Sequence, residues 1–201
     1  IAEASKIADS AREAVVEFAT QRQLAETVAS EEIALRSIEE MGELGVVLGV
    51  FGRLRNLIKI EKGYEHAVEA TAAGWLDSIV VQDFKTAFVC TETLRRLKLG
   101  RIKIIPLKEL INLKPVRHTK IDGVSGTVSE LVKYSKRFEQ AVTFVFGDTL
   151  VAKDDKAALT ACREGHRAVT VNGDLYEAGG AIECGYYRAP IDFASLIPRE
   201  T

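Results

Sequence analysis

One six-residue motif occurs twice in this chain, 74 residues apart. Residues 49–54 read Gly-Val-Phe-Gly-Arg-Leu, and residues 123–128 read Gly-Val-Ser-Gly-Thr-Val. The residues after each copy also match in glycine, aromatic and apolar positions, and after a gap of three, residues 79–83 align with residues 150–154. A match that stays in step for so long indicates an internal duplication. The sequence therefore predicts a mixed α/β fold built from two related units.

A long helix is expected before the first unit. From residue 5 to about residue 43 there is no Gly or Pro before Gly42, and good helix formers dominate. An imperfect coiled-coil seam follows alternating spacings of four and three: Ile7, Ala11, Ala14, Phe18, Gln21, Ala25, Val28, Glu32 and Leu35. So long a helix favours a coiled-coil arm that reaches out of the globule. An amphipathic helix packed on its own domain is the alternative.

Each unit is expected to repeat one order of strands and helices. In the first unit we expect strands at residues 46–51, 54–60, 79–81 and 101–107, and helices at 63–73 and 83–97. In the second we expect strands at residues 123–134, 149–152 and 167–171, and helices at 135–146 and 154–164. Residues 101–105 are taken as the counterparts of residues 167–171. Asn172-Gly173 is typical of a hairpin turn, so residues 175–177 should return as an antiparallel strand.

These expectations divide the chain into four parts. We predict an arm at residues 1–44, a first subdomain at 45–114, a second subdomain at 115–185, and the start of a returning arm or linker at 186–201. A basic connector, residues 108–121, joins the two subdomains.

Composition narrows the class of protein. No apolar run approaches the roughly 20 residues that span a bilayer, and the first residues lack the pattern of a secretory signal, so no membrane partner is expected. Three cysteines far apart argue against a disulfide framework and favour a reducing, cytoplasmic location. The only methionine is Met41, so the chain is expected to begin inside a longer protein.

No pattern in the chain indicates catalysis, a metal or a cofactor. The histidines, His66, His118 and His166, have no neighbouring His or Cys at ligand spacing. The Gly-x-x-Gly of each repeat is followed by strand-like residues, whereas a phosphate loop needs a helix there. We therefore expect no catalytic residues, no metal and no bound cofactor.

Charge is distributed unevenly along the chain. Residues 1–44 hold ten acidic and four basic side chains, whereas residues 95–120 hold nine basic and one acidic. Such a run can neutralise phosphates without reading sequence; a solvated helix end and connector is the alternative. The candidate DNA-binding residues are Arg95, Arg96, Lys98, Arg101, Lys103, Lys108, Lys114, Arg117 and Lys120.

From Gly49 to Gly185 the chain resembles the hinge domain of SMC (structural maintenance of chromosomes) proteins. Several segments carry the resemblance together: the Gly-Val-Phe-Gly-Arg-Leu motif, Tyr-Glu-His-Ala-Val-Glu-Ala at 64–70, Ile-Val-Val-Gln-Asp at 79–83, Phe-Gly-Asp-Thr-Leu-Val at 146–151 and Val-Asn-Gly-Asp-Leu at 171–175. Departures from the family pattern at residues 178–185 favour a divergent, archaeal member, and the few Asn and Gln residues suit a thermophile.

The resemblance implies a homodimeric hinge of two subdomains, flanked by the strands of a long antiparallel coiled coil. It implies that each subunit's first subdomain meets its partner's second, with weak DNA binding and with the ATPase heads elsewhere in the full protein. The protein would then associate with the chromosome or nucleoid.

The same resemblance places the dimer interface near the end of the second subdomain. The family has a glycine-rich run there, and the matching residues include Gly180, Ala181, Ile182, Glu183, Cys184 and Gly185. Glycine lets two backbones approach closely. Here Cys184 replaces one glycine and Glu183 replaces a small hydroxyl residue, which predicts an altered interface.

Two other functions stay open on the residues alone. Duplicated α/β units often form a ligand site between their halves, so a small-molecule-binding regulatory domain or enzyme with a coiled-coil handle is one. A module whose main function is nucleic-acid binding is the other.

Overall fold

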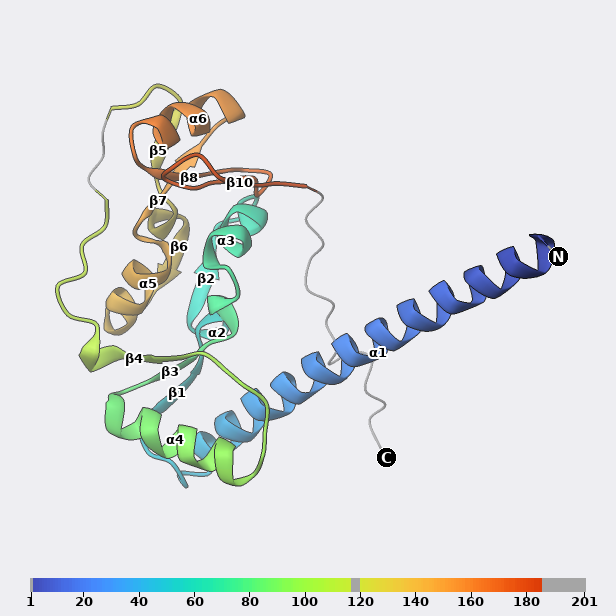
Figure 1. Cartoon of the computed structure of the whole chain (residues 1–201). Helices are drawn as coiled ribbons and strands as arrows, with labels where there is room; N and C mark the ends of the chain where they lie inside the picture. Colours follow the sequence, from blue (N-terminus) through green and yellow to red (C-terminus); the bar gives the residue numbers. More distant parts are fainter. Residues whose placement is uncertain (1, 117–119, 186–201) are drawn as a thin grey trace.

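The computed structural model describes residues 2–116 and 120–185, with side chains from residue 10 onward. A single long helix, α1 (Ala2–Glu43), leads into a globular part made of two units (Figure 1). Every residue from 10 to 27 is exposed, so this half of α1 projects away from the globule. The helix expected over residues 5–43 is confirmed.

The first unit begins at the first copy of the repeated motif. Its elements are β1 (Val50–Arg53), α2 (Leu54–Leu57), β2 (Ile58–Ile60), α3 (Glu65–Ala72), the 3-10 turn η1 (Trp75–Asp77), β3 (Ile79–Val81), α4 (Phe84–Arg96), β4 (Ile104–Pro106) and the 3-10 turn η2 (Leu107–Glu109). The strand expected over residues 54–60 is wrong in its first half, where α2 forms. Apolar residues at 54, 57 and 58 suit a helical turn as well as a strand, and so short a run does not distinguish them.

The second unit repeats this order. Its elements are β5 (Val124–Thr127), η3 (Val128–Leu131), β6 (Val132–Tyr134), η4 (Lys136–Phe138), α5 (Glu139–Phe146), β7 (Thr149–Ala152), α6 (Asp155–Arg163), β8 (Arg167–Thr170), β9 (Leu175–Tyr176) and β10 (Ile182–Glu183). The return strand expected after Asn172-Gly173 is confirmed as β9, which pairs antiparallel with β8.

Each unit contains one main sheet. Sheet I has the strand order β1-β3-β4, and sheet II has the order β10-β9-β8-β7-β5. In both, the first strand pairs antiparallel with a bulge before Gly52 or Gly126, and a helix then crosses to a parallel strand. The crossing helices also begin alike: Asp83 accepts a hydrogen bond from the Thr86 amide, and Asp154 from the Ala157 amide. Such caps satisfy amides that the helix leaves free.

A third, two-stranded sheet joins the units. Strands β2 and β6 pair antiparallel with Lys59 opposite Lys133, and these two lysines are counterparts in the repeat. Helices α3 and α5, also counterparts, lie against each other. An internal two-fold axis therefore passes between the two lysines. Around it lies core 1, a cluster of buried residues from both units that includes Leu54, Val128 and Phe146.

Two further cores cover the outer faces of the main sheets. Core 2 packs α1 and α4 on sheet I, with Ala34 and Ile38 of α1 fully buried. Core 3 packs α6 on sheet II, and there Ile121 of the connector fills a place beside the helix. The arm thus covers sheet I, and the connector helps to cover sheet II.

The alignment of residues 101–105 with residues 167–171 is wrong by two residues. Strand pairing makes Ile104, opposite Ile79, the counterpart of Ala168, opposite Leu150. Lys98 and Gly165 are equivalent left-handed residues after α4 and α6 (φ 53° and 86°). The first unit therefore has three extra residues between its helix and its last strand, within residues 99–102. We call residues 99–102 the insertion.

Candidate functional site

The two main sheets end in different ways on the side away from β1 and β5, and each leaves an open strand edge there within the described residues. In sheet II the outer side of β8 pairs with β9, and β9 with β10. In sheet I the equivalent strand, β4, pairs with β3 alone. The first unit thus lacks the two strands that complete the second. An unpaired strand edge is a template for pairing with another chain.

The open edge of sheet II is β10, in the predicted interface segment. Ile182 lies opposite Tyr176, and the side chain of Ile182 is 52% exposed. The amide of Glu177 donates to the carbonyl of Ala181 at 2.8 Å. Hydrogen-bonded and non-hydrogen-bonded pairs alternate along an antiparallel ladder. The N–H and C=O of Ile182 therefore point outward, toward the open edge.

The two predicted interface glycines have local conformational roles. Gly180 ends a turn in which its amide donates to the carbonyl of Glu177 at 3.0 Å, and its φ is 101°. Gly185 has a φ of 137°, and its amide donates to the Asp174 carboxylate at 3.4 Å. L-residues rarely adopt such φ angles. A β-carbon on either glycine would meet nothing within 4 Å. An aspartate at these positions would strain the turn directly, so interface variants are better placed elsewhere.

The open edge of sheet I offers fewer partners. Ile79 donates its amide to the carbonyl of Lys103 at 2.9 Å, so Ile105 faces β3 while Ile104 and Pro106 face outward. Pro106 has no N–H, which confines it to an edge position. An added strand would find the N–H and C=O of Ile104 and the C=O of Pro106.

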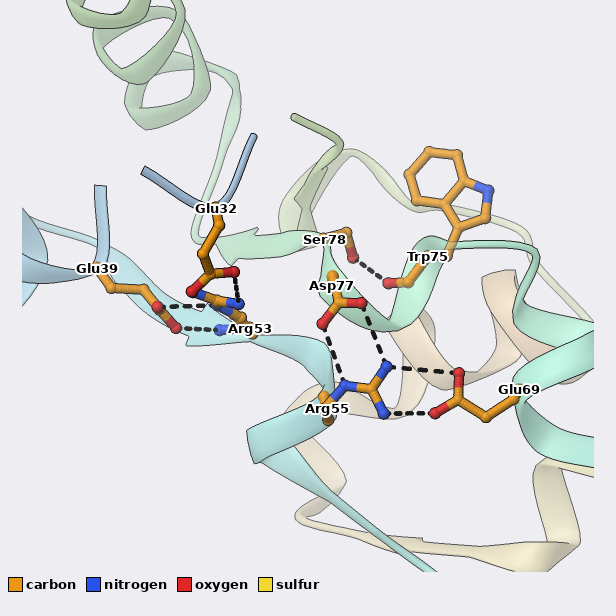
Figure 2. A network of polar contacts seen from close by, with 8 residues as sticks. All are labelled: Glu32, Glu39, Arg53, Arg55, Glu69, Trp75, Asp77 and Ser78. Carbon is orange, nitrogen blue, oxygen red and sulfur yellow. Dashed lines mark hydrogen bonds and ion pairs between the residues drawn. The ribbon is translucent and has the colours of Figure 1, made fainter. Parts of the chain in front are cut away.

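Arg53 fixes the direction of the arm. Its guanidinium contacts Glu32 through two hydrogen bonds of 2.9 Å and Glu39 through one of 2.9 Å (Figure 2). The two glutamates are seven residues apart on one face of α1. The hydrogen bonds from Arg53 hold the pKa of Glu32 below its usual value, with a smaller contribution from Arg36. In the second unit the counterpart of Arg53 is Thr127, which caps η3 instead.

The insertion also touches the arm. A β-carbon on Gly100 would lie 2.7 Å from the carbonyl oxygen of Ser30, so the two backbones are in close contact. The two features that only the first unit has, Arg53 and the insertion, therefore both hold α1. Comparing the repeats could have drawn attention to Arg53, because its position and that of Phe51 are the two that differ in character between otherwise matching motifs. The position of the insertion could not be read without strand pairing.

A second arginine binds the first unit together. Arg55 pairs with Glu69 of α3 and, at 3.1 Å, with Asp77 of η1 (Figure 2). Nearby, a hollow of about 510 Å³ lies between α1 and the insertion, with Glu31 and Asp77 facing Arg101 and Lys103 in its walls. Four of the seven residues that line the hollow are therefore charged, two of each sign.

We call the place where α1 meets the insertion, at Ser30 and Gly100, the arm root. Five of the predicted DNA-binding residues lie around it. Arg95 and Arg96 end α4, Lys98 follows it, and Arg101 lies on the insertion; all four are exposed. Lys103 is also exposed, but its ammonium donates to the carbonyl of Ala73 at 2.8 Å and lies 5.0 Å from the ring of Trp75.

The remaining predicted cations are not in this group. Lys108 forms an ion pair of 3.4 Å with Asp83, and Lys114 and Lys120 lie on the connector. Lys120 precedes Ile121, which packs on sheet II, so the structure separates it from the residues at the arm root. Arg117, His118 and residues 186–201 lie outside the described residues.

The described ranges contain neither a helix able to span a membrane nor a cluster of metal ligands. Every helix there is too short or too polar to cross a lipid bilayer. No three His, Cys, Asp or Glu side chains in those ranges gather as metal ligands would.

Comparison with known proteins gives one consistent result. The family model for the SMC proteins Flexible Hinge Domain matches residues 47–162. The Chromosome partition protein Smc of Aquifex aeolicus is 36% identical over 142 residues, which is 69% of this chain and 12% of the relative. This chain therefore spans a small part of such a protein.

Solved hinge structures share the fold. The Pyrococcus furiosus Smc hinge domain with an extended coiled coil has a TM-score of 0.71 and 29% identity, over 89% of this chain and 64% of that one. An asymmetric dimer of the Geobacillus stearothermophilus SMC hinge domain has a TM-score of 0.69 and 24% identity, over 84% of this chain and 75% of that one.

Proposed function

This chain belongs to the family of SMC hinge domains, and from that premise we propose that it is the dimerisation hinge of a chromosome-organising SMC protein. One observation carries the proposal: sheet I ends at β4 without the strands that complete sheet II, and sheet II ends in the exposed strand β10. In a two-fold dimer the edge of sheet I in each copy can be covered by the edge of sheet II in the other, because the axis repeats each contact.

The two edges are compatible with direct pairing. β10 of one copy would add to β4 of the other, extending three strands by five into one continuous sheet. The outward N–H and C=O of Ile182 would then meet those of Ile104. Main-chain hydrogen bonds of this kind give affinity in strand addition. The Geobacillus stearothermophilus hinge also forms a dimer, an asymmetric one, which supports dimerisation and leaves the strand pairing to be tested.

Sedimentation equilibrium of the wild-type chain tests this proposal. The chain has a mass of 22.0 kDa, and we expect twice that mass at micromolar concentration. A mass of 22.0 kDa throughout that range would falsify the dimer.

We further propose that the arm root binds DNA weakly through Arg95, Arg96, Lys98 and Arg101. These exposed cations lie together at the end of α4 and on the insertion, beside the arm. Phosphate contacts release counterions, so binding should fall with salt and should not depend on base sequence.

Reversing the charge at Arg95, Arg96 and Arg101 to glutamate is expected to lower DNA affinity at least about tenfold at low salt, and to reduce the salt slope by about one unit per lost contact. Fluorescence anisotropy with labelled duplex DNA at several salt concentrations measures both quantities. The control reverses two charges, Lys114 and Lys120 on the connector, so losses are compared per reversed charge. Equal losses in the two variants, or none in either, would place DNA binding away from the arm root.

The wider setting follows from the relatives. They are chromosome partition proteins, so we propose that the full-length protein acts on the chromosome in the cytoplasm. ATP binding and hydrolysis would then belong to parts of that protein beyond this chain.

A further inference from the structure

Helix α4 exposes a pair of aromatic rings. Phe84 is 50% exposed and Phe88 is 66% exposed, and their rings stack with centroids 5.8 Å apart and planes 24° apart. In the second unit the equivalent residues of α6 are Asp155 and Leu159. The fold therefore does not require aromatic residues here. Exposed apolar patches of this kind mark interaction sites.

The aromatic pair lies on the flank of α4 nearest the open edge of sheet I. On one side of the helix, the hydroxyl of Thr86 donates to the carbonyl of Leu48, just before β1. At 100° per residue, Phe84 and Phe88 each lie about 160° around the helix axis from Thr86. The amide of Phe84 donates to the carboxylate of Glu109, just after β4, at 3.2 Å. Because β1 and β4 are on opposite sides of β3, Phe84 lies on the β4 side, and the more exposed ring of Phe88 stacks on it.

The edge of sheet II carries a matching apolar side chain. Ile182 is directly opposite Tyr176, so both side chains lie on one face of the sheet. Tyr176 packs in core 3 beneath α6, and its hydroxyl donates to Asp155 of that helix at 3.0 Å. Ile182 therefore lies on the same face as α6, as does exposed Cys184 two residues later.

Antiparallel pairing would bring these two surfaces together. β10 runs parallel to β8, because each is antiparallel to β9. In each unit a helix connects two neighbouring parallel strands, α4 between β3 and β4 and α6 between β7 and β8, and such crossovers are right-handed. When β10 of a second copy runs antiparallel to β4, its α6 and the α4 of the first copy therefore lie on one face of the joined sheet. Ile182 of the second copy then lies beside α4, on the flank that holds the two phenylalanines.

We infer that Phe84 and Phe88 form an apolar anchor in the homodimer interface and receive Ile182 of a second copy of this chain. The inference rests on the proposed dimerisation and names one of its contacts. The aliphatic character of Ile182 and the position of the rings beside an open strand edge favour this occupant. Stacked exposed rings can also bind bases of a single strand, so the test includes that outcome.

A double variant, Phe84→Asp with Phe88→Asp, measures the anchor. We expect the dimer dissociation constant to rise about 30-fold, because two half-exposed rings lose their apolar contact, while far-UV circular dichroism stays unchanged. Leu48→Asp is the matched control: Leu48 is 80% exposed and lies on the other flank of α4, so its dissociation constant should equal that of wild type. A wild-type monomer would overturn the proposed dimerisation itself, whereas a wild-type dimer with an unchanged double variant overturns only the anchor.

A cysteine crosslink locates the contact. Cys90 and Cys162 are buried and Cys184 is exposed, so Cys184→Ser leaves a background without an exposed native thiol. Disulfides form only when the β-carbons come within about 4.5 Å. In a Cys184→Ser background, we expect Ile182→Cys combined with Phe84→Cys or Phe88→Cys to form a covalent dimer on mild oxidation, and Ile182→Cys alone to form none with the buried thiols. Leu48→Cys combined with Ile182→Cys should give none. A single-stranded DNA affinity that falls in the double variant while the dissociation constant and crosslinks stay at control levels would assign the rings to nucleic acid and overturn the anchor.

Discussion

Replacing Ile182 by proline is expected to leave the chain monomeric where the wild-type chain is a dimer. The outward N–H of Ile182 would be lost, and the proline ring would stand where a second strand must approach. A buried carbonyl left without its donor costs about 1–3 kcal/mol, and a two-fold dimer loses the contact twice. We expect the dissociation constant to rise about 100-fold or more, measured by sedimentation equilibrium over a range of concentrations.

A second proline in the same hairpin is the control. Ala178 follows Glu177 in the turn closed by the Gly180 amide, and its φ is not in the left-handed region. Proline is favoured at the second residue of such turns. Ala178→Pro should therefore leave both the hairpin and the dimer intact. If Ile182→Pro dimerises as strongly as Ala178→Pro, the interface does not use the edge of β10.

The repeat made most of the fold predictable. Equivalent apolar runs implied equivalent strands, and Asp83 and Asp154 marked the starts of equivalent helices before any strand pairing was known. The repeat could not show that Lys59 and Lys133 face each other, because nothing in one copy of a motif says how it meets the other. The alignment of residues 101–105 with residues 167–171 is wrong for a related reason: Arg101 and Arg167 look equivalent as residues, and only the strand partners distinguish them.

The candidate site was less predictable than the fold. The sequence placed Gly180 and Gly185 at a close backbone contact, but within one chain their positive φ angles already account for glycine. It assigned Phe84 and Phe88 to a helix without showing their exposure, because which flank a residue occupies depends on the neighbouring sheet. The open edge of β4 is likewise visible only when its strand partners are known, and the sequence does not show which strands pair.

Replacing Phe146 by alanine is expected to destabilise both units together. Phe146 is fully buried on α5 in the second unit, in core 1, which also contains Leu54, Val68 and Leu76 of the first. Removing such a ring costs about 3–5 kcal/mol, part of it for the cavity left behind. Because both units share this core around the internal two-fold axis, the loss should appear in each unit and lower the unfolding midpoint by roughly 10 °C.

The position of the single tryptophan allows this coupling to be measured. Trp75 lies in the first unit and its ring packs against Phe144 of α5, with centroids 5.0 Å apart. Its fluorescence therefore reports unfolding of the first unit and of its contact with the second, while far-UV circular dichroism reports the whole chain. At one fixed protein concentration, needed because dimerisation contributes to stability, Phe146→Ala should shift both urea transitions equally. Leu159→Ala, at a residue of α6 that is 37% exposed, should shift them much less. A tryptophan transition that stays at the wild-type midpoint while the dichroism transition splits would mean that the two units unfold separately, despite the residues they share in core 1.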